Sequence, residues 1–201
     1  SRQDASLSEV LEHRGGVAAD HATTDGVGLT IQVDQNFWKQ RFARRFGEGK
    51  LILDDGTYTE QGKKDLAVGT VFLPRDSRSN YNRCREIFEE EFNKKGYEVS
   101  ERESPMEDHF LGKLAKKTHP RIFQYCILQK SGITNEEFDA DIYRIRRTIE
   151  KRVQVEGLSG QGQNRFYISS LSRHIITLKG LALAHRLQDL YTDLRYSENL
   201  V

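Results

Sequence analysis

Side chains that could take part in chemistry are concentrated between His13 and Gly28, in the sequence HRGGVAADHATTDGVG. The stretch combines an imidazole, a guanidinium and a carboxylate with glycines that can adopt a positive φ or approach another segment closely. From the residue types alone, Arg14 could form a structural salt bridge or cap carbonyl groups. The carboxylate of Asp25 could accept N–H groups of the turn that follows it. The alternative interpretation of the glycines is that they only form turns.

Two local elements are expected to position this stretch. Ser6 and Glu9 have the spacing of a capping box, which predicts a short helix, SLSEVLEHR, that ends at the glycine pair 15 and 16. The DGVG sequence predicts a turn, and residues 29–33 predict a buried strand. Helix, turn and strand would form a compact αβ corner.

Composition limits the class of protein. A chain of 201 residues has the size of one domain, and its net charge of +1 gives no support for a polyanionic partner such as a nucleic acid. No apolar run is long enough to span a membrane, and no signal-peptide pattern opens the chain. Cys84 and Cys126 have no metal-ligand spacing, so we expect buried free thiols in a reducing, cytoplasmic setting.

Hydrophobic periodicity predicts alternating strands and amphipathic helices along the rest of the chain. Helices are expected at residues 35–46 after a cap at Asp34, at 80–95, from a capping box at Thr134 and Glu137 to Val153, and at 181–191. Strands are expected at residues 67–73, 97–102, 121–129, 166–170 and 174–178, the last two paired with each other. Residues 48–65 are expected to form a loop or small hairpin, and GLSGQGQ (157–163) a flexible loop that lacks the lysine of a phosphate-binding loop.

The helix predicted after Thr134 has a basic face. Its basic residues lie mostly off the apolar stripe: Arg144, Arg146, Arg147, Lys151 and Arg152. Such a face could bind nucleic acid, or it could be a solvated face balanced by neighbouring carboxylates. The near-zero net charge favours the second interpretation.

Several sequence blocks together resemble a known family. HRG, AD and TTDGVGL, followed by IQV and the aromatic pair Phe37 and Trp38, resemble the amino-terminal glutamine amidotransferase domain of glutamate synthase. Further blocks keep the order of that family: AVGTVFLPRD, LGKLAKKTHPRIFQ, IYRIRRTIEKR, FYISSLS, TLKGLALA and LYTDLR. The resemblance implies an α/β (α+β) fold of the N-terminal-nucleophile (Ntn) hydrolase kind. This is a four-layer αββα sandwich, expected to be incomplete here, with residues 1–201 forming a single partial domain.

The resemblance also implies a reaction. In this family the thiolate of an amino-terminal cysteine attacks the amide carbon of glutamine, and the α-amino group of the same residue acts as the base. Neither Cys84 nor Cys126 matches the position of that nucleophile, and the later RFSTNT and HNGE motifs of the family are not found. We therefore expect the chain to resemble the interior of the domain, without the catalytic nucleophile.

Positions that match the family's motifs are the candidate site residues. The resemblance implies that one group borders the substrate pocket: His13, Arg14 and Gly15. A second group would form a turn that supports the site: Asp25, Gly26 and Gly28. The family has glycine at the position of Thr24 and alanine at that of Val27, so the turn can differ in detail.

The implied function is the glutaminase half of glutamate synthase, with glutamine as substrate and ammonia passed on to aminate 2-oxoglutarate. FMN and an iron–sulfur cluster would belong to a synthase domain or subunit elsewhere, since the chain has no cysteine cluster and no dinucleotide-binding fingerprint, and we expect no metal in it. Two alternatives stay open: a catalytically inactive amidotransferase-like module that binds a partner or holds a complex together, and a basic-helix binding module. An incomplete sheet would expose an edge, which predicts oligomerisation or aggregation.

Overall fold

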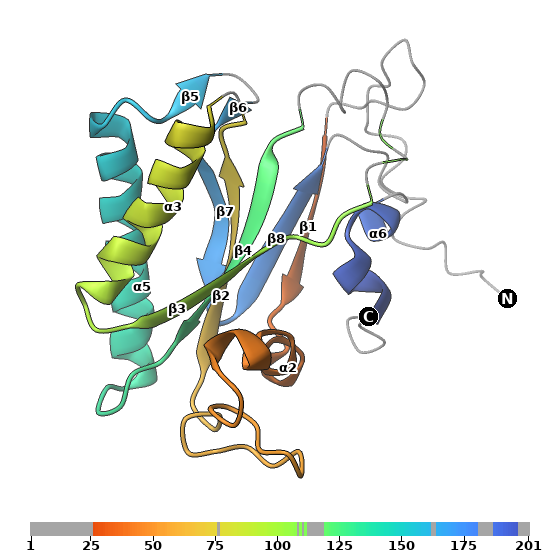
Figure 1. Ribbon diagram of the computed structural model, residues 1–201, viewed down its shortest axis with the longest axis vertical. Helices are drawn as coiled ribbons and strands as arrows, with labels where there is room; N and C mark the ends of the chain where they lie inside the picture. The colour runs from red at the N-terminus through yellow and green to blue at the C-terminus, as the bar shows by residue number, and fades with distance from the viewer. Residues whose placement is uncertain are drawn as a thin grey trace, which may run out of the picture. The chain divides into compact units, whose positions relative to one another are not determined.

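The computed structural model describes residues 26–75, 77–107, 109, 111, 119–161, 164–180 and 187–196. Its helices are α2 (Gln35–Phe46), α3 (Arg78–Asn93), α5 (Asn135–Val155) and α6 (Leu187–Leu190), with a 3-10 helix η2 (Thr192–Tyr196) (Figure 1). Its strands are β1 (Val27–Gln32), β2 (Leu66–Leu73), β3 (Glu98–Glu103), β4 (Arg121–Leu128), β5 (Gly160–Gln161), β6 (Asn164–Arg165), β7 (Tyr167–Ser172) and β8 (Ile175–Gly180). The chain forms two compact units. The larger comprises Ile31–Glu103 and Pro120–Ile176, and the smaller comprises Ser1–Thr30, Ser104–His119 and Thr177–Val201.

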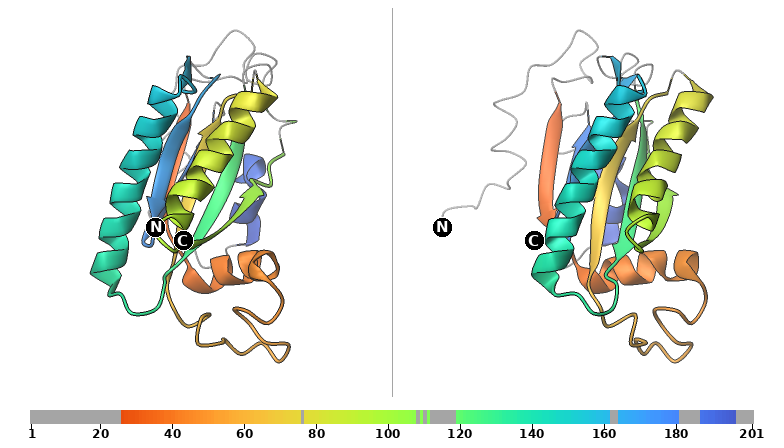
Figure 2. Two further views of the ribbon diagram at one scale, coloured as in Figure 1. Left: turned by 60° about the vertical axis from the view of Figure 1, so that its left-hand side comes forward. Right: turned by 90° about the vertical axis from the view of Figure 1, so that its left-hand side faces the viewer.

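The larger unit is built on a four-stranded antiparallel sheet in the order β3-β4-β2-β7. The central strand β2 pairs with β4 along its whole length, from Leu66 opposite Leu128 to Leu73 opposite Arg121. Its pairing with β7 shifts register between Thr70 and Val71. Helices α3 and α5 lie side by side across one face of this sheet (Figures 1 and 2). The mixed helix and strand character expected from the sequence is confirmed.

Apolar side chains from both helices and one face of the sheet form the main core. The predicted stripe of α5 is buried as expected: Phe138, Ile142, Ile145, Ile149 and Val153. Aromatic rings connect the layers, since Phe88 of α3 stacks on Tyr125 of β4 at 3.9 Å between centroids. Tyr97 stacks on Phe138 of α5 at 5.5 Å. These contacts fix both helices on the sheet.

The helix starts follow the capping signals in the sequence. The side chain of Asp34 accepts hydrogen bonds from two backbone N–H groups of α2, as predicted. Thr134 and Glu137 form the expected reciprocal capping box at the start of α5. Helix α3 begins two residues earlier than predicted, because Ser77 provides the cap by accepting the N–H of Asn80 at 3.2 Å.

Helix α2 packs against the other face of the four-stranded sheet, where Trp38 and Phe42 are buried. The guanidinium of Arg102, from β3, lies 5.5 Å from both aromatic rings and donates to the amide oxygen of Gln124 at 2.7 Å. Gln35 donates its side-chain N–H groups to the carbonyl oxygens of Leu66 and Arg173, at 2.9 and 3.1 Å. These bonds attach the start of α2 to the strands.

Two predictions about strands are wrong. Strands β7 and β8 were expected to pair with each other, but β7 pairs with β2 and β8 pairs with β1 in a separate two-stranded sheet. No tight turn joins them; instead the hydroxyl of Ser172 accepts the N–H of His174, and the N–H of Val33 binds the carbonyl of His174. The GLSGQGQ segment is not only a loop, because β5 within it pairs with β6.

The segment 48–65 is a small irregular hairpin, as predicted. Ile52 and Tyr58 form an isolated antiparallel bridge, and the N–H of Leu53 donates to the carbonyl of Thr57 at 2.8 Å. Gly62 lies directly against this hairpin, since a Cβ placed on it would be 1.9 Å from the carbonyl oxygen of Leu51. The backbone of the hairpin is therefore closed by a contact that only glycine permits.

Candidate functional site

The described part of the predicted supporting turn comprises Gly26 and Gly28. Gly26 has a φ of 111°, a backbone conformation that favours glycine. Gly28 lies within β1, and a Cβ there would be 3.5 Å from Cγ of Lys179, an ordinary contact. Of the two expected reasons for glycine, a positive φ is thus confirmed at Gly26, whereas Gly28 meets no close approach. The other predicted site residues, His13, Arg14, Gly15 and Asp25, lie outside the described residues.

Strand β1, which follows this turn, is supported by contacts within the smaller unit. Thr30 and Thr177 form a cross-strand hydrogen bond between their hydroxyls at 2.9 Å. The buried hydroxyl of Tyr191 donates to the carbonyl of Lys179 in β8 at 2.7 Å, and burial raises the pKa of this phenol. A bidentate ion pair between Arg195 and Glu107, with N···O distances of 2.8 and 3.1 Å, holds the last described residues of this unit.

Both cysteines are buried free thiols, which confirms the prediction made for them. Burial raises the pKa of Cys84 to about 12, and it also raises the pKa of Cys126 well above its ordinary value. Because the thiolate is the nucleophilic form, burial and a raised pKa disfavour both side chains as nucleophiles.

Other kinds of site find little support among the described residues. No group of three or more histidine, cysteine, aspartate or glutamate side chains in that part of the chain could hold a metal ion. None of the described helices combines the length and the apolar character needed to cross a membrane.

The basic face of α5 is occupied by ion pairs. Arg146 and Arg147 both bind Glu150, and Arg144 lies 3.6 Å from Asp141. The remaining arginine, Arg152, contacts three carboxylates: Glu90, Glu91 and Glu156. This arrangement favours the solvated, internally balanced face over a nucleic-acid interface.

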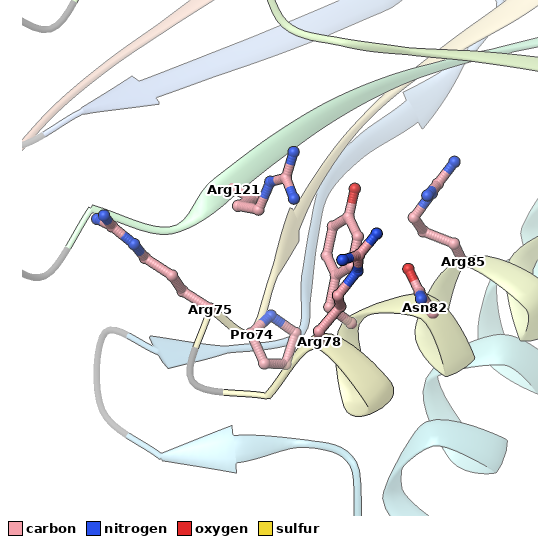
Figure 3. Close-up of a pocket in the computed structure, with 7 residues that line it drawn as sticks. Pro74, Arg75, Arg78, Asn82, Arg85 and Arg121 are labelled. Atoms are coloured by element: carbon pink, nitrogen blue, oxygen red, sulfur yellow. The ribbon is translucent and has the colours of Figure 1, made fainter.

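A basic cavity in the larger unit was not predicted from the sequence. It has a volume of about 450 Å³ and is lined by Pro74, Arg75, Arg78, Tyr81, Asn82, Arg85 and Arg121 (Figure 3). The lining side chains come from the segment after β2, from the first two turns of α3 and from the start of β4. The spacing of two arginines in the sequence could have indicated part of this cavity. Arg78 and Arg85 are seven residues apart, which places them on one face of a helix.

Comparison with known proteins identifies the family. The model of the class II glutamine amidotransferases matches residues 2–200. The chain is 39% identical over 183 residues to the large chain of an NADPH glutamate synthase of Azospirillum brasilense, covering 90% of this chain and 11% of that protein. It is 31% identical over 187 residues to a ferredoxin-dependent glutamate synthase of Cyanidium caldarium, covering 92% of this chain and 11% of that protein.

The mixed helix and strand architecture with antiparallel sheets is that of an Ntn-hydrolase-like domain. The chain belongs to the class II glutamine amidotransferases. It spans about 11% of the length of the curated relatives quoted above. The family resemblance expected from the HRG and TTDGVGL blocks is therefore confirmed.

Proposed function

We propose that this chain is part of the glutaminase domain of a glutamate synthase, and that the domain hydrolyses glutamine to glutamate and ammonia. The observation that carries the proposal is the 39% identity to a glutamate synthase large chain across 90% of this chain. The ammonia would be transferred to a synthase domain or subunit that aminates 2-oxoglutarate, an ammonia-assimilating and oxidoreductive reaction of glutamate biosynthesis in the cytoplasm. Glutamine is thus the substrate for this part of the protein.

The chemistry requires an activated thiolate and stabilisation of the oxyanion that forms on the amide carbon. Cys84 and Cys126 are buried and remain protonated, which supports a separate amino-terminal cysteine as the nucleophile. Arg14, flanked by His13 and Gly15, would border the glutamine pocket. A guanidinium near the nucleophile would favour the thiolate and hold negative charge.

The turn at Asp25, Gly26 and Gly28 would support that pocket without contacting the reacting atoms. The positive φ of Gly26 supports this role, because such a backbone conformation is typical of glycine in turns. The carboxylate of Asp25 would bind N–H groups of the turn. None of these three residues needs to contact glutamine itself.

The iron–sulfur cluster of a complete glutamate synthase does not fit the residues of this chain. The sequence contains two cysteines, fewer than the about four thiolates that a cluster takes. Both thiols are also buried in the core of the larger unit. We propose that the synthase domain or subunit holds both the cluster and FMN.

Glutamine hydrolysis by the native protein and by its Arg14→Ala variant tests the proposal. If Arg14 borders the pocket, kcat/KM for glutamine falls at least about tenfold, as expected for loss of a charged contact to the reacting centre. The matched control Arg144→Ala removes an exposed guanidinium from α5 and leaves kcat/KM unchanged.

A diazoketone analogue of glutamine, which alkylates the catalytic thiolate, provides a second measurement. Peptide mass mapping should place the label on an amino-terminal cysteine and leave Cys84 and Cys126 unmodified. A native protein with neither glutaminase activity nor label would overturn the proposal in favour of an inactive amidotransferase-like module.

A further inference from the structure

The arginine-lined cavity has the size and chemistry of a ligand site. Its volume of about 450 Å³ falls within the range of roughly 300–1,000 Å³ that is typical of small-molecule pockets. Of the described lining residues, four are arginines and none is acidic. Arg75 follows β2, Arg78 and Arg85 belong to α3, and Arg121 opens β4, so three parts of the chain bring positive charge to one hollow (Figure 3).

Two carboxylates outside the cavity lining and one aromatic ring of the lining hold Arg85 and Arg121 in place. Glu103 accepts hydrogen bonds from Nε and Nη2 of Arg121 at 2.9 and 2.7 Å, and Glu101 pairs with Arg85 in the same bidentate manner. The guanidinium of Arg121 also lies 4.4 Å from the ring centroid of Tyr81. Positions fixed in this way lower the ordering cost of binding an anion.

The start of α3 adds to the positive potential. The N-terminal end of a helix carries a partial positive charge, and acidic residues are favoured in the first turn. Here the first turn contains no acidic residue and begins with Arg78, a cation at the unfavourable end. Among the described residues, no hydrogen bond or ion pair engages the Arg78 side chain. A residue that opposes helix stability, such as an arginine in the first turn, is expected at positions where function requires it.

From these observations we propose that the cavity binds a small oxyanion with two or more negative charges, of the phosphate-ester or polycarboxylate class. Glu101 and Glu103 match the charges of Arg85 and Arg121, whereas Arg78 has no described partner and Arg75 adds a fourth guanidinium to the lining. Planar guanidinium groups bind phosphate and carboxylate oxygens in a bidentate manner, and the amide of Asn82 adds a donor. This site belongs to the larger unit and is independent of glutamine hydrolysis.

Calorimetric titration of the native protein with inorganic pyrophosphate, and separately with citrate, tests the proposal. The Arg75→Gln/Arg78→Gln double variant should bind the preferred anion at least about tenfold more weakly, because charge-assisted hydrogen bonds are lost. Arg78 makes no hydrogen bond or ion pair among the described residues, so Arg78→Gln alone should leave the thermal transition unchanged and still weaken binding of the anion. Arg144→Gln is the matched control: it removes one exposed positive charge from α5, where the side chain is 73% exposed, and should bind as the wild type does.

The anion that shows this loss identifies the ligand class, pyrophosphate for phosphate esters and citrate for polycarboxylates. Absence of binding by both anions overturns the proposal, as does unchanged binding in the double variant. An equal loss in Arg144→Gln would mean bulk attraction without a site and also overturns it. A hexaglutamate peptide that binds where neither small anion does would overturn it in favour of a protein-docking surface.

Discussion

Replacing Arg173 by alanine should destabilise the larger unit, because this guanidinium joins two carboxylates from different elements. Its Nη1 donates to Asp65, before β2, at 2.8 Å, and its Nε and Nη2 donate to Asp139 of α5 at 3.2 and 3.0 Å. Only 14% of the Arg173 side chain is exposed, whereas Asp65 and Asp139 are 30% and 38% exposed. Removal of the arginine leaves both carboxylates partly desolvated, and Asp139 keeps only a weaker contact with His174, whose Nε2 lies 3.4 Å from Oδ2.

The expected loss follows from these bonds. Hydrogen bonds to charged groups contribute about 1.5–3 kcal/mol each to stability. Water can solvate the two partly exposed carboxylates in the variant, which offsets much of the loss of these bonds. We therefore expect the free energy of unfolding to fall by about 2–3 kcal/mol near pH 7 for Arg173→Ala. The control Arg147→Ala, whose side chain is 65% exposed, should cost less than about 0.5 kcal/mol.

The stability lost in Arg173→Ala should depend on pH, which distinguishes loss of the ion pairs from simple loss of packing. The Arg173 guanidinium, with a smaller contribution from His174, holds the pKa of Asp139 below its ordinary value. A lowered pKa contributes stability that is present above the ordinary carboxyl pKa and is lost as the pH falls through the folded-state value. The difference between wild type and variant should therefore shrink towards about pH 3.

Urea unfolding of the 201-residue chain, followed by the fluorescence of its single tryptophan, measures this difference. Trp38 is 4% exposed and lies in the same unit as Arg173, so its emission reports on the unit that is perturbed. A loss below about 0.5 kcal/mol near pH 7, or a loss that persists undiminished in acid, would refute the reasoning.

Two further predictions concern close packing and burial. Gly62→Ala should destabilise the larger unit by more than about 2 kcal/mol in the same urea assay, since the new Cβ would lie 1.9 Å from the carbonyl oxygen of Leu51. Equal stability of wild type and variant would contradict this prediction. Burial raises the pKa of Cys84 to about 12 and also raises the pKa of Cys126. Iodoacetamide at about pH 8 should therefore leave both thiols unmodified in the native protein and alkylate both in urea, as measured by intact mass. Rapid labelling of the native protein would show that a thiol is accessible.

Local signals in the sequence predicted individual helices and strands well. The capping box at Thr134 and the stripe from Phe138 to Val153 define α5 because both act within a few residues of each other. Asp34 likewise placed the start of α2 correctly. Of the helix expected at residues 181–191, the positions before Leu187 lie outside the described residues, and α6 covers Leu187–Leu190.

Pairing between distant segments could not be predicted in the same way. The expected β7–β8 pairing failed because strand proximity in sequence was the only argument for it, without a turn sequence to fix the register. The basic cavity was missed because Arg75, Arg78 and Arg121 come together only after β2 and β4 have paired. Residue types at a site are visible in a sequence, but their convergence depends on such non-local contacts.

The topology of the central strand β2 also determines when this chain can fold. Leu73 pairs with Arg121 and Val68 pairs with Ser172. Both neighbours of β2 in the sheet are therefore synthesised well after β2 itself. At a synthesis rate of about 5–20 residues per second, the partner β7 follows β2 after roughly 5–20 s. The other partner, β4, follows after roughly half that time, and until then the apolar segment LAVGTVFL has no strand beside it, which makes the nascent chain prone to aggregation before it becomes an amidotransferase domain.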